Sequence, residues 1–450
     1  MYKMVLHKYQ QDTVTAVVDQ LTSGGGAAIL ADPGLGKTVM TLETLKRIGG
    51  QTLLVAPLRV CQSVWRQEND KWEYGFSIGL VHGSVKKRMA VLEEDHDIYL
   101  MTPDGAKWFE KEYDCELDNL VIDESTAYKG WNSQRSKSMR RLCKSFRTRL
   151  LLTGTPVPQS LIDWHGQAYL LDFGKRFGAT CKAFRSEWCR QGGFQGRVWE
   201  FSGDVKAFEQ RMGENCHRLE ANDHLDMPEL IINDIECFMN PKQRAMYKSL
   251  EDDLFAQIDG GMVELMSPGS VYQKCRQAAN GFVYGEGGET LFIHDEKQQV
   301  VTSLLNEIGE KPVLFGHMFK EDERRMVEDF GCASISGSCP NNRLLSIIDD
   351  WNANQLTRLT VQPAAASHGL NLQYSGCRHL IWLALPNQSE LYTQFIARIY
   401  RQGQAHGSVI VHRLFMGNTV EEIAKDRLDG KISDQASLLE NLKNYRTKVG

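Results

Sequence analysis

The chain has 450 residues, of which 42% are hydrophobic and 24% charged, and its formal net charge is −5. This length exceeds what one compact core usually holds, so we expect two or more domains. No run of about 18 apolar residues occurs, so no transmembrane helix is expected. The net charge does not indicate a nucleic-acid-binding protein, although a local basic groove would suffice, because affinity follows the phosphates contacted.

The first residues and the cysteines favour an intracellular, cytoplasmic location. Residues 1–10 are polar and mixed and lack the apolar core of a signal peptide. The 11 cysteines are an odd number and form no Cys-x-x-Cys pair. Neither a disulfide framework nor a zinc site is therefore expected, and a reducing compartment is the better interpretation.

Short β-rich runs alternate with helical stretches in both halves of the chain. Near-continuous apolar runs of this length are typical of parallel strands covered on both faces, and their alternation with helices indicates a doubly wound sheet. We therefore predict two α/β lobes, residues 1–225 and 226–450. The expected strands are 27–30, 53–56, 98–101, 120–122 and 150–152 in the first lobe, and 313–315, 333–335, 359–361, 380–383 and 409–414 in the second.

Two stretches between these elements have other compositions. From Asp172 to Glu296 the alternation fails, and charged residues and helix formers dominate, so we interpret this part as helical insertions plus the interlobe linker. From Arg135 to Arg149 there are seven positive residues and no acidic one. A basic groove and a solvated helix face explain this second stretch about equally well.

A phosphate-binding loop is predicted after the first expected strand. Residues 31–38 read Ala-Asp-Pro-Gly-Leu-Gly-Lys-Thr and open a helical stretch, which is the context that a P-loop needs. Gly34 and Gly36 let backbone N–H groups curl around phosphates. Lys37 places a positive charge on the β and γ phosphates, and the Thr38 hydroxyl can bind Mg²⁺. The sequence therefore predicts an ATP and Mg²⁺ site.

Two carboxylates complete the predicted nucleotide site. Leu120 to Ile122 form an apolar strand that ends in Asp123 and Glu124. We expect Asp123 to hold Mg²⁺ through water, and Glu124 to orient and deprotonate the attacking water. A strand that ends in solvated acids is common by itself, but a P-loop requires such a partner on a neighbouring strand.

Two arginines of the second lobe are candidates for stabilising the transferring phosphoryl group. Arg398 and Arg401 lie three residues apart, on one face of an expected helix. A guanidinium fork suits the charge that develops on this group, and an arginine finger is worth about 10³ to 10⁵ in rate. Ordinary surface arginines are the alternative interpretation.

Short motifs follow one another in a fixed order along nearly the whole chain. They are 6–10, 31–38, 54–57, 101–103, 123–126, 152–156, 225–228 with 240–247, 313–315, 367–373 and 394–404. On these residues the chain resembles the Snf2 family of superfamily 2 helicase-like ATPases. The linker motif and the closing Arg-x-Gly-Gln of 401–404 favour this family over DEAD-box relatives.

The resemblance implies two RecA-like lobes that bind ATP in the cleft between them and move on duplex or branched DNA. It implies that Gln10 reads the adenine, and that Thr102 and Ser367 hold backbone phosphates. It further implies that Thr153, Thr155 and Gln394 couple the nucleotide state to motion. Binding is expected to be independent of DNA sequence, because phosphate contacts carry no sequence information.

The chain departs from the family pattern at three places. The loop 31–38 is one residue shorter than usual, with Pro33 before Gly34. Thr126 stands where the family has histidine, so the coupling of hydrolysis to motion is in question rather than ATP binding. Ser367-His368 stands where small residues are usual.

Other functions remain open at this point. A strand-separating helicase would need a wedge, for which a short hairpin at 192–200 is a candidate. An RNA motor and the motor subunit of a larger DNA-processing complex are further alternatives. A non-catalytic binding module is disfavoured, because Lys37, Glu124, Arg398 and Arg401 are all present.

Overall fold

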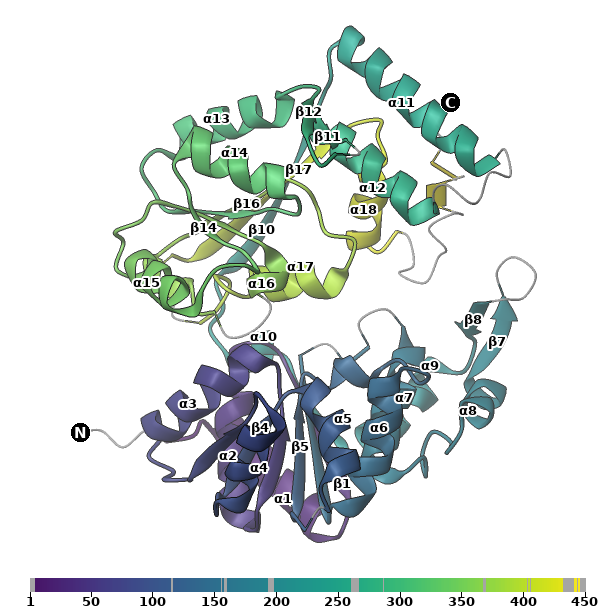
Figure 1. Cartoon of the computed structure of the whole chain (residues 1–450), viewed down its shortest axis with the longest axis vertical. Helices are drawn as coiled ribbons and strands as arrows, with labels where there is room; N and C mark the ends of the chain where they lie inside the picture. Colours follow the sequence, from purple (N-terminus) through teal and green to yellow (C-terminus); the bar gives the residue numbers. More distant parts are fainter. Residues whose placement is uncertain are drawn as a thin grey trace. The chain divides into compact units, whose positions relative to one another are not determined.

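The computed structural model describes residues 5–114, 116–154, 156–157, 160–192, 198–259, 267–285, 287–366, 370–402, 404, 406–431, 441–442 and 444–445. The chain forms two compact units, Met1–Asp226 and Met227–Gly450, which we call lobe 1 and lobe 2 (Figure 1). Each lobe is an α/β unit with its own sheet and its own core. We describe each lobe by itself.

Lobe 1 is built on a seven-stranded sheet in the order β3-β4-β2-β5-β6-β1-β9, and all its neighbouring strands are parallel. Its central strands are short and almost entirely buried, as is typical of parallel strands covered on both faces. The strands are β1 (Gly26–Ala31), β2 (Thr52–Val55), β3 (Ile78–Val81), β4 (Ile98–Met101), β5 (Asn119–Asp123), β6 (Thr148–Thr153) and β9 (Cys216–Leu219).

Helices cover both faces of this sheet, as the alternation of side chains along β1 shows. Ala28 and Leu30 pack into one apolar cluster, whereas Ala27 and Ile29 pack into the other. Helices α5, α6 and α7 contribute to the first cluster, and α1 and α2 to the second. The helices of lobe 1 are α1 (Lys8–Thr22), α2 (Lys37–Ile48), α3 (Trp65–Lys71), α4 (Val85–Glu93), α5 (Pro103–Glu112), α6 (Gln134–Leu142), α7 (Trp164–Asp172), α8 (Cys181–Trp188), α9 (Val205–Gly213) and α10 (Ala221–His224).

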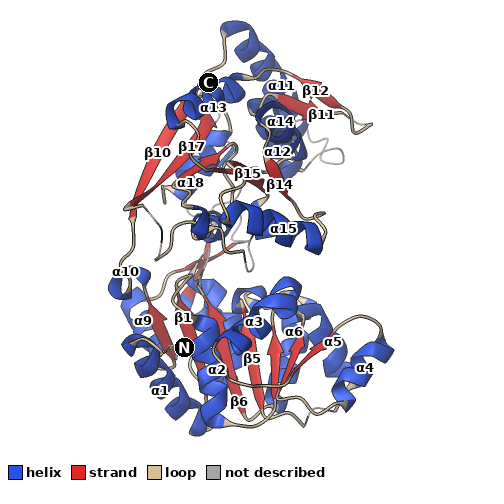
Figure 2. Cartoon of the chain, turned by 90° about the vertical axis from the view of Figure 1, so that its left-hand side faces the viewer, coloured by secondary structure: helices blue, strands red, loops and turns tan. Residues whose placement is uncertain are grey.

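Lobe 2 has a six-stranded parallel sheet in the order β10-β17-β16-β13-β15-β14. Its strands are β10 (Glu229–Cys237), β13 (Val313–Gly316), β14 (Ala333–Ile335), β15 (Arg358–Val361), β16 (His379–Trp382) and β17 (Ser408–Met416). Its helices are α11 (Pro241–Asp259), α12 (Pro268–Ala279), α13 (Glu296–Ile308), α14 (Lys320–Phe330), α15 (Asn341–Asn352), α16 (Pro363–Ala366), α17 (Ser389–Ile396) and α18 (Glu421–Leu428). Figure 2 shows the strands of each lobe with helices packed outside them. The predicted doubly wound, two-lobed fold is confirmed.

The middle of the chain contains more strands than its composition predicts. Between Asp172 and Glu296 the structure has α8, α9, α11 and α12, but it also has edge strands β9 and β10 and two small antiparallel pairs. The predicted helical insertions are present, but the strands among them were not predicted. Seven of the nine residues of β10 are exposed, so this edge strand is not buried on both faces as the central strands are. The small pairs are β7 (Cys189–Gly192) with β8 (Val198–Phe201), and β11 (Phe282–Tyr284) with β12 (Thr290–Phe292).

Among the described residues, no helix has both the length and the hydropathy that a membrane span requires.

Candidate active site

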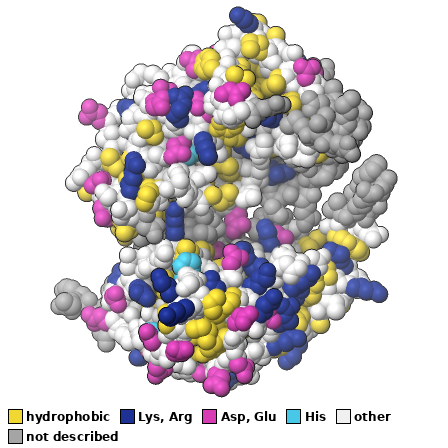
Figure 3. Space-filling view, in the orientation of Figure 1, with side chains coloured by type: hydrophobic (Ala, Val, Ile, Leu, Met, Phe, Trp, Pro, Cys, Tyr) yellow, Lys and Arg dark blue, Asp and Glu magenta, His cyan; other side chains and the backbone are white. Residues whose placement is uncertain are grey.

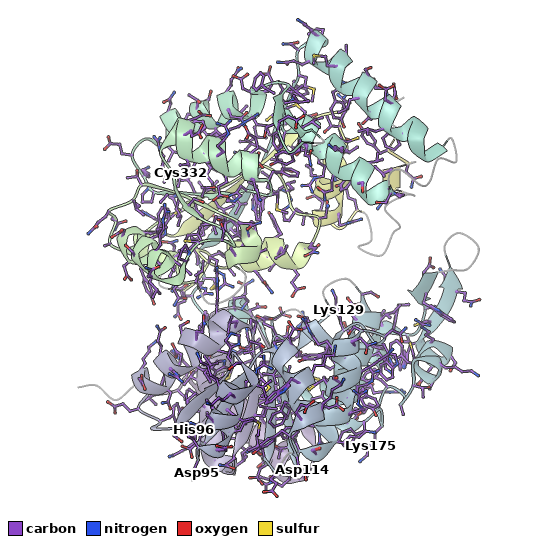
Figure 4. All side chains as sticks on the ribbon, viewed as in Figure 1. Asp95, His96, Asp114, Lys129, Lys175 and Cys332 are labelled. Atoms are coloured by element: carbon purple, nitrogen blue, oxygen red, sulfur yellow. The ribbon has the colours of Figure 1, made fainter. Side chains whose placement is uncertain are left out.

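The three segments of the predicted nucleotide site lie at one edge of the lobe 1 sheet. Strands β5, β6 and β1 are neighbours, with Leu30 paired to Thr153 and Asp123 paired to Leu152. Because these strands are parallel, the loop after β1, the acids at the end of β5 and the turn after β6 meet at their carboxyl ends. Figure 4 shows the two ends of this sheet: Asp95 and Asp114 precede β4 and β5 at one end, and Lys129 follows β5 at the other.

The loop 31–38 has the backbone of a phosphate cradle. Gly34 and Gly36 have φ of 93° and 81°, a region that side chains with a Cβ rarely adopt. Helix α2 begins at Lys37, directly after Gly36, so its first N–H groups open toward the loop. A Cβ on Gly36 would lie 2.5 Å from Nε2 of Gln10, so a side chain here would displace the amide of Gln10.

Lys37 reaches across the loop to the edge of the sheet. Its Nζ donates hydrogen bonds to the carbonyl oxygens of Ala31 at 2.6 Å and Asp32 at 3.4 Å. A Cβ placed on Gly154, in the turn after β6, would lie 3.8 Å from this ammonium group. The positive charge therefore lies among the three segments, where it can bind phosphate oxygens.

Asp123 and Glu124 form a half-buried acidic pair beside this charge. Burial raises the pKa of Asp123, the charge of Glu124 raises it further, and Lys37 offsets part of the rise. A desolvated carboxylate of this kind fits a divalent cation, which would offset the cost of its burial. Asp123 and Thr38 are the residues that could hold Mg²⁺, and they carry the oxygen ligands that this ion prefers.

The backbone of Glu124 is strained. Its φ of 53° lies in the left-handed region, which is unusual for a residue with a Cβ. Such strain costs about 1–3 kcal/mol and persists only where the surroundings hold it, most often at active sites. The amide of Glu124 donates to Oδ1 of Asp123 at 3.0 Å, which ties the two acids together.

Gln10, at the start of α1, lies against the loop. Its Nε2 donates to the carbonyl oxygen of Leu35 at 3.1 Å, and its Oε1 accepts from the amide of His7 at 2.9 Å. The neighbouring Tyr9 stacks on His224, with ring centroids 4.6 Å apart. The start of α1 thus contacts both the loop 31–38, through Gln10, and helix α10, through Tyr9 and His224.

The turn after β6 is joined to the acids by a residue that the sequence does not single out. Thr153 is fully buried at the end of β6, whereas Thr155 lies outside the described residues. The hydroxyl of Ser125 donates to Oε1 of Gln167 at 2.7 Å, and Nε2 of Gln167 donates to the carbonyl oxygen of Pro156 at 2.6 Å. Gln167 lies in α7 and belongs to no recognisable motif, so no local signal indicated it.

In lobe 2, the two candidate arginines, Arg398 and Arg401, are hydrogen-bonded to the segment that begins at Leu370. Arg398 Nη1 donates to the carbonyl oxygen of Leu370 at 3.3 Å, and Arg401 Nη1 donates to Oδ1 of Asn371 at 2.8 Å. Burial lowers the pKa of Arg401 to about 10, so its guanidinium keeps its charge at neutral pH. In the same part of the lobe, Gln394 Nε2 donates to Oε1 of Glu390 at 3.2 Å.

The prediction that these arginines share a helical face was wrong. Helix α17 ends at Ile396, and residues 397–402 form turns. Backbone hydrogen bonds of the tight i→i+3 kind, from Arg398 to Phe395 and from Ile399 to Ile396, replace the regular helix. The amide of Gln404 donates to the carbonyl oxygen of Arg401, which closes the turn.

Thr102 lies at the start of α5, beside a small hollow. Its Oγ1 accepts from the amide of Gly105 at 3.1 Å and so caps the helix. The hollow, about 260 Å³ in volume, lies between the first turns of α5 and α6 and is lined by Lys107, Ser133 and Arg135 together with Pro103, Asp104, Ala127 and Gln134. Ser367 and His368 lie outside the described residues.

Much of the basic stretch 135–149 has structural roles. Arg149 is buried and donates to the carbonyl oxygens of Leu171 and Phe146, and Arg141 forms an ion pair with Glu110. The guanidinium of Arg140 stacks on Trp131 at 3.9 Å. Figure 3 nevertheless shows Lys and Arg side chains gathered over α5 and α6. Exposed members of this surface include Lys107, Lys111 and Lys144.

Comparison of this chain with known protein families shows which family it matches. The SNF2-related domain matches residues 9–280, and the helicase conserved C-terminal domain matches residues 296–403. The chain belongs to the SNF2-related family of helicase-like ATPases. The resemblance inferred from the sequence is confirmed, and so is the expected enzyme class, a nucleic-acid-dependent ATPase of helicase superfamily 2.

Relatives of this SNF2-related ATPase differ in length. It is 31% identical to "Putative protein p41" of Acyrthosiphon pisum secondary endosymbiont phage 1, over 95% of this chain and 97% of that protein. It is 24% identical to "Putative ATP-dependent helicase/translocase YwqA" of Bacillus subtilis, over 98% of this chain but only 50% of that protein. The solved "Sulfolobus solfataricus SWI2/SNF2 ATPase core in complex with dsDNA" is 22% identical and covers 99% of this chain and 96% of its own, with a TM-score of 0.45.

Proposed function

We propose that this SNF2-related ATPase hydrolyses ATP between its two lobes and uses the energy to move along duplex or branched DNA, which it remodels. The meeting of Lys37, Asp123 and Glu124 at the carboxyl edge of β1 and β5 carries the proposal. A cationic group, a cation-binding carboxylate and a candidate general base are the parts that phosphoryl transfer to water requires.

Each residue of the site has one task in this proposal. The loop amides and Lys37 bind the β and γ phosphates, while Gln10 reads the adenine. Asp123 and Thr38 would hold Mg²⁺, which supplies charge neutralisation on the phosphates when it is bound. Glu124 orients the attacking water and accepts its proton.

Lobe 2 completes the site in this proposal. Arg398 and Arg401 approach the γ-phosphate when the lobes close, and they stabilise the charge that builds there. A contribution of about 10³ to 10⁵ in rate is typical of such arginines. Thr153, Thr155 and Gln394 relay the presence of the γ-phosphate from one lobe to the other.

The DNA contacts are proposed at backbone phosphates. The hollow beside Thr102 supports this, because two helix amino termini and the positive residues Lys107 and Arg135 line it. Ser367 is proposed as the corresponding contact in lobe 2. Binding through phosphates is independent of base sequence and weakens as salt is raised.

The decisive experiment is ATP turnover by the purified protein. It is measured without nucleic acid and with single-stranded DNA, duplex DNA, a four-way junction or RNA, beside the Glu124→Gln variant. Stimulation by duplex or junction DNA that disappears in this variant is the expected result. Stimulation by RNA or single strands alone would overturn the choice of DNA duplex as the track, and no turnover at all would overturn the proposal.

One observation favours strand separation as a second activity. Strands β7 and β8 form an antiparallel hairpin, with Cys189 paired to Phe201 and Gly192 paired to Val198. This is the hairpin that the sequence suggested as a wedge, although residues 193–197 lie outside the described residues. A forked DNA with one labelled strand separates the two activities, because only a helicase releases that strand.

We also propose an intracellular location. All ten cysteines in the described part of the chain are free thiols, and seven of them are buried, which suits a reducing compartment.

A further inference from the structure

Gln167 connects two segments of the nucleotide site through its side-chain amide. Its Oε1 accepts a hydrogen bond from the hydroxyl of Ser125 at 2.7 Å. Ser125 is the residue directly after Glu124. Its Nε2 donates to the carbonyl oxygen of Pro156 at 2.6 Å and to that of Asp163 at 3.1 Å. Both Ser125 and Gln167 are completely buried. Water therefore cannot replace any of these hydrogen bonds.

The orientation of this amide is determined by its partners. One end meets two carbonyl oxygens that only accept, so the NH₂ group must face them, and the Ser125 hydroxyl, which can donate or accept, donates to Oε1 at the other end. Glutamine is therefore required here, since neither glutamate nor an apolar residue can serve both ends at once.

Close packing of α7 brings Gln167 to this position. A Cβ on the preceding Gly166 would lie 2.4 Å from the carbonyl oxygen of Tyr128 and 2.9 Å from that of Lys129. Helix α7 therefore lies directly against the turn Ser125–Tyr128 that follows the acids. Lys129 Nζ also forms an ion pair with Asp163 at the start of α7, with 3.8 Å between the charged atoms.

We infer that Gln167 is a positioning residue for hydrolysis, which holds Glu124 in register with the turn after β6. Glu124 has a strained backbone with φ of 53°, so something must hold it. Ser125 follows Glu124 directly in the chain, and Gln167 ties Ser125 to Pro156. The inference rests on the proposed function, because it assigns Gln167 to the reaction in which Glu124 activates water.

The test uses the full chain, three variants of the connection and one control variant. Ser125→Ala and Gln167→Leu each remove the connection, and the double variant measures whether they act as one unit. Thr148→Val is the matched control. It removes the buried hydrogen bond, 2.7 Å long, from Thr148 Oγ1 to Oδ1 of Asn119, which links the amino ends of β6 and β5 and lies away from the Ser125–Gln167 connection. Nucleotide affinity, kcat and KM for ATP are measured with saturating duplex DNA, and thermal unfolding is recorded for each variant.

The expected result separates positioning from stability. Gln167→Leu and Ser125→Ala should each lower kcat about tenfold or more, with nucleotide affinity and KM within about twofold of wild type, since Lys37 and the loop are untouched. The double variant should be no slower than the slower single one. Thr148→Val should keep its kcat even where it lowers the unfolding temperature.

Two results would count against the inference. Unchanged kcat in Gln167→Leu, or an equal loss of kcat in Thr148→Val, would show that Gln167 has only a structural role. Absence of turnover in the wild-type protein is a different failure, because it would overturn the proposed function and this inference with it.

Discussion

Lys297 of α13 and Glu421 of α18 form an ion pair inside lobe 2, with 2.7 Å between the charged atoms and side-chain exposures of only 2% and 3%. The remaining donors of Lys297 reach the carbonyl oxygen of Leu383 at 2.7 Å and Oδ1 of Asn280 at 2.5 Å. Glu421 accepts from the amide of Met416 at 2.8 Å. The pair thus joins α12, α13, α18 and the ends of β16 and β17.

Removing one partner should be far more harmful than removing both. Lys297→Met leaves a buried carboxylate without its cation, and such a change costs about 3–5 kcal/mol. The double variant Lys297→Met with Glu421→Leu should recover most of that loss, because an apolar pair of similar volume is often as stable. Urea unfolding, followed by a probe in lobe 2, measures both. Equal losses in the single and double variants would contradict this account.

Gly36→Ala should abolish nucleotide binding with little effect elsewhere. The new Cβ meets Gln10 Nε2 at 2.5 Å, and the φ of 81° adds a strain of about 1–2 kcal/mol. Gly83→Ala is the control, because Gly83 has φ of 96° but its nearest neighbour would be Cδ of Lys87 at 3.5 Å. Binding of a fluorescent ATP analogue should be lost in the first variant and kept in the second. Equal binding in both would show that the loop is not the nucleotide site.

Acid should destabilise both lobes through buried histidines. Burial lowers the pKa of His165 in lobe 1, and of His294, His317 and His379 in lobe 2, to about 4. The unfolded chain binds these protons near pH 6.5, so unfolding takes up protons and stability falls as the pH drops from about 6.5 to 4. Above this window the histidines contribute no pH dependence.

His165→Phe tests the contribution of one histidine. His165 stacks between Trp131 at 4.2 Å and Phe184 at 4.4 Å, and a phenyl ring can keep both contacts. Between pH 6.5 and 4 the unfolding of lobe 1 should take up about one proton fewer than in the wild type, as the slope of its unfolding free energy against pH reports. An unchanged slope would mean that His165 is already protonated in the folded lobe.

Lys107 should contribute to DNA binding through a phosphate. Lys107→Gln should weaken the binding of any duplex to a similar degree and should lower the slope of log affinity against log salt by about 1. Lys111→Gln is the control, since Lys111 is exposed on the same helix but does not line the hollow. Titrations of two unrelated duplexes at several salt concentrations measure both effects. A loss confined to one duplex would indicate base contacts instead.

The residues of the candidate nucleotide site in lobe 1 could be picked out from the sequence, because the features that mark them are local. Gly34 and Gly36 had to adopt positive φ, Lys37 had to follow them at the start of a helix, and Asp123 had to end a buried strand. Each of these requirements acts over a few residues, so the residue types themselves indicate it. The buried central strands were predictable for the same reason, since an apolar run shows burial on both faces.

The sequence by itself determined the apolar central strands and the loop that has the pattern of a phosphate-binding loop; tertiary structure alone decided which segments meet. Ser125 and Gln167 are 42 residues apart, and nothing in either neighbourhood indicates the other. The edge strands β9 and β10 take their places from pairing with β1 and β17, not from an apolar pattern of their own. Arg140 and Arg149 have structural roles because the fold brings Trp131 beside the first and Leu171 beside the second. Long-range hydrogen bonds and packing of this kind leave no periodic signal, because each depends on a partner that the fold brings near.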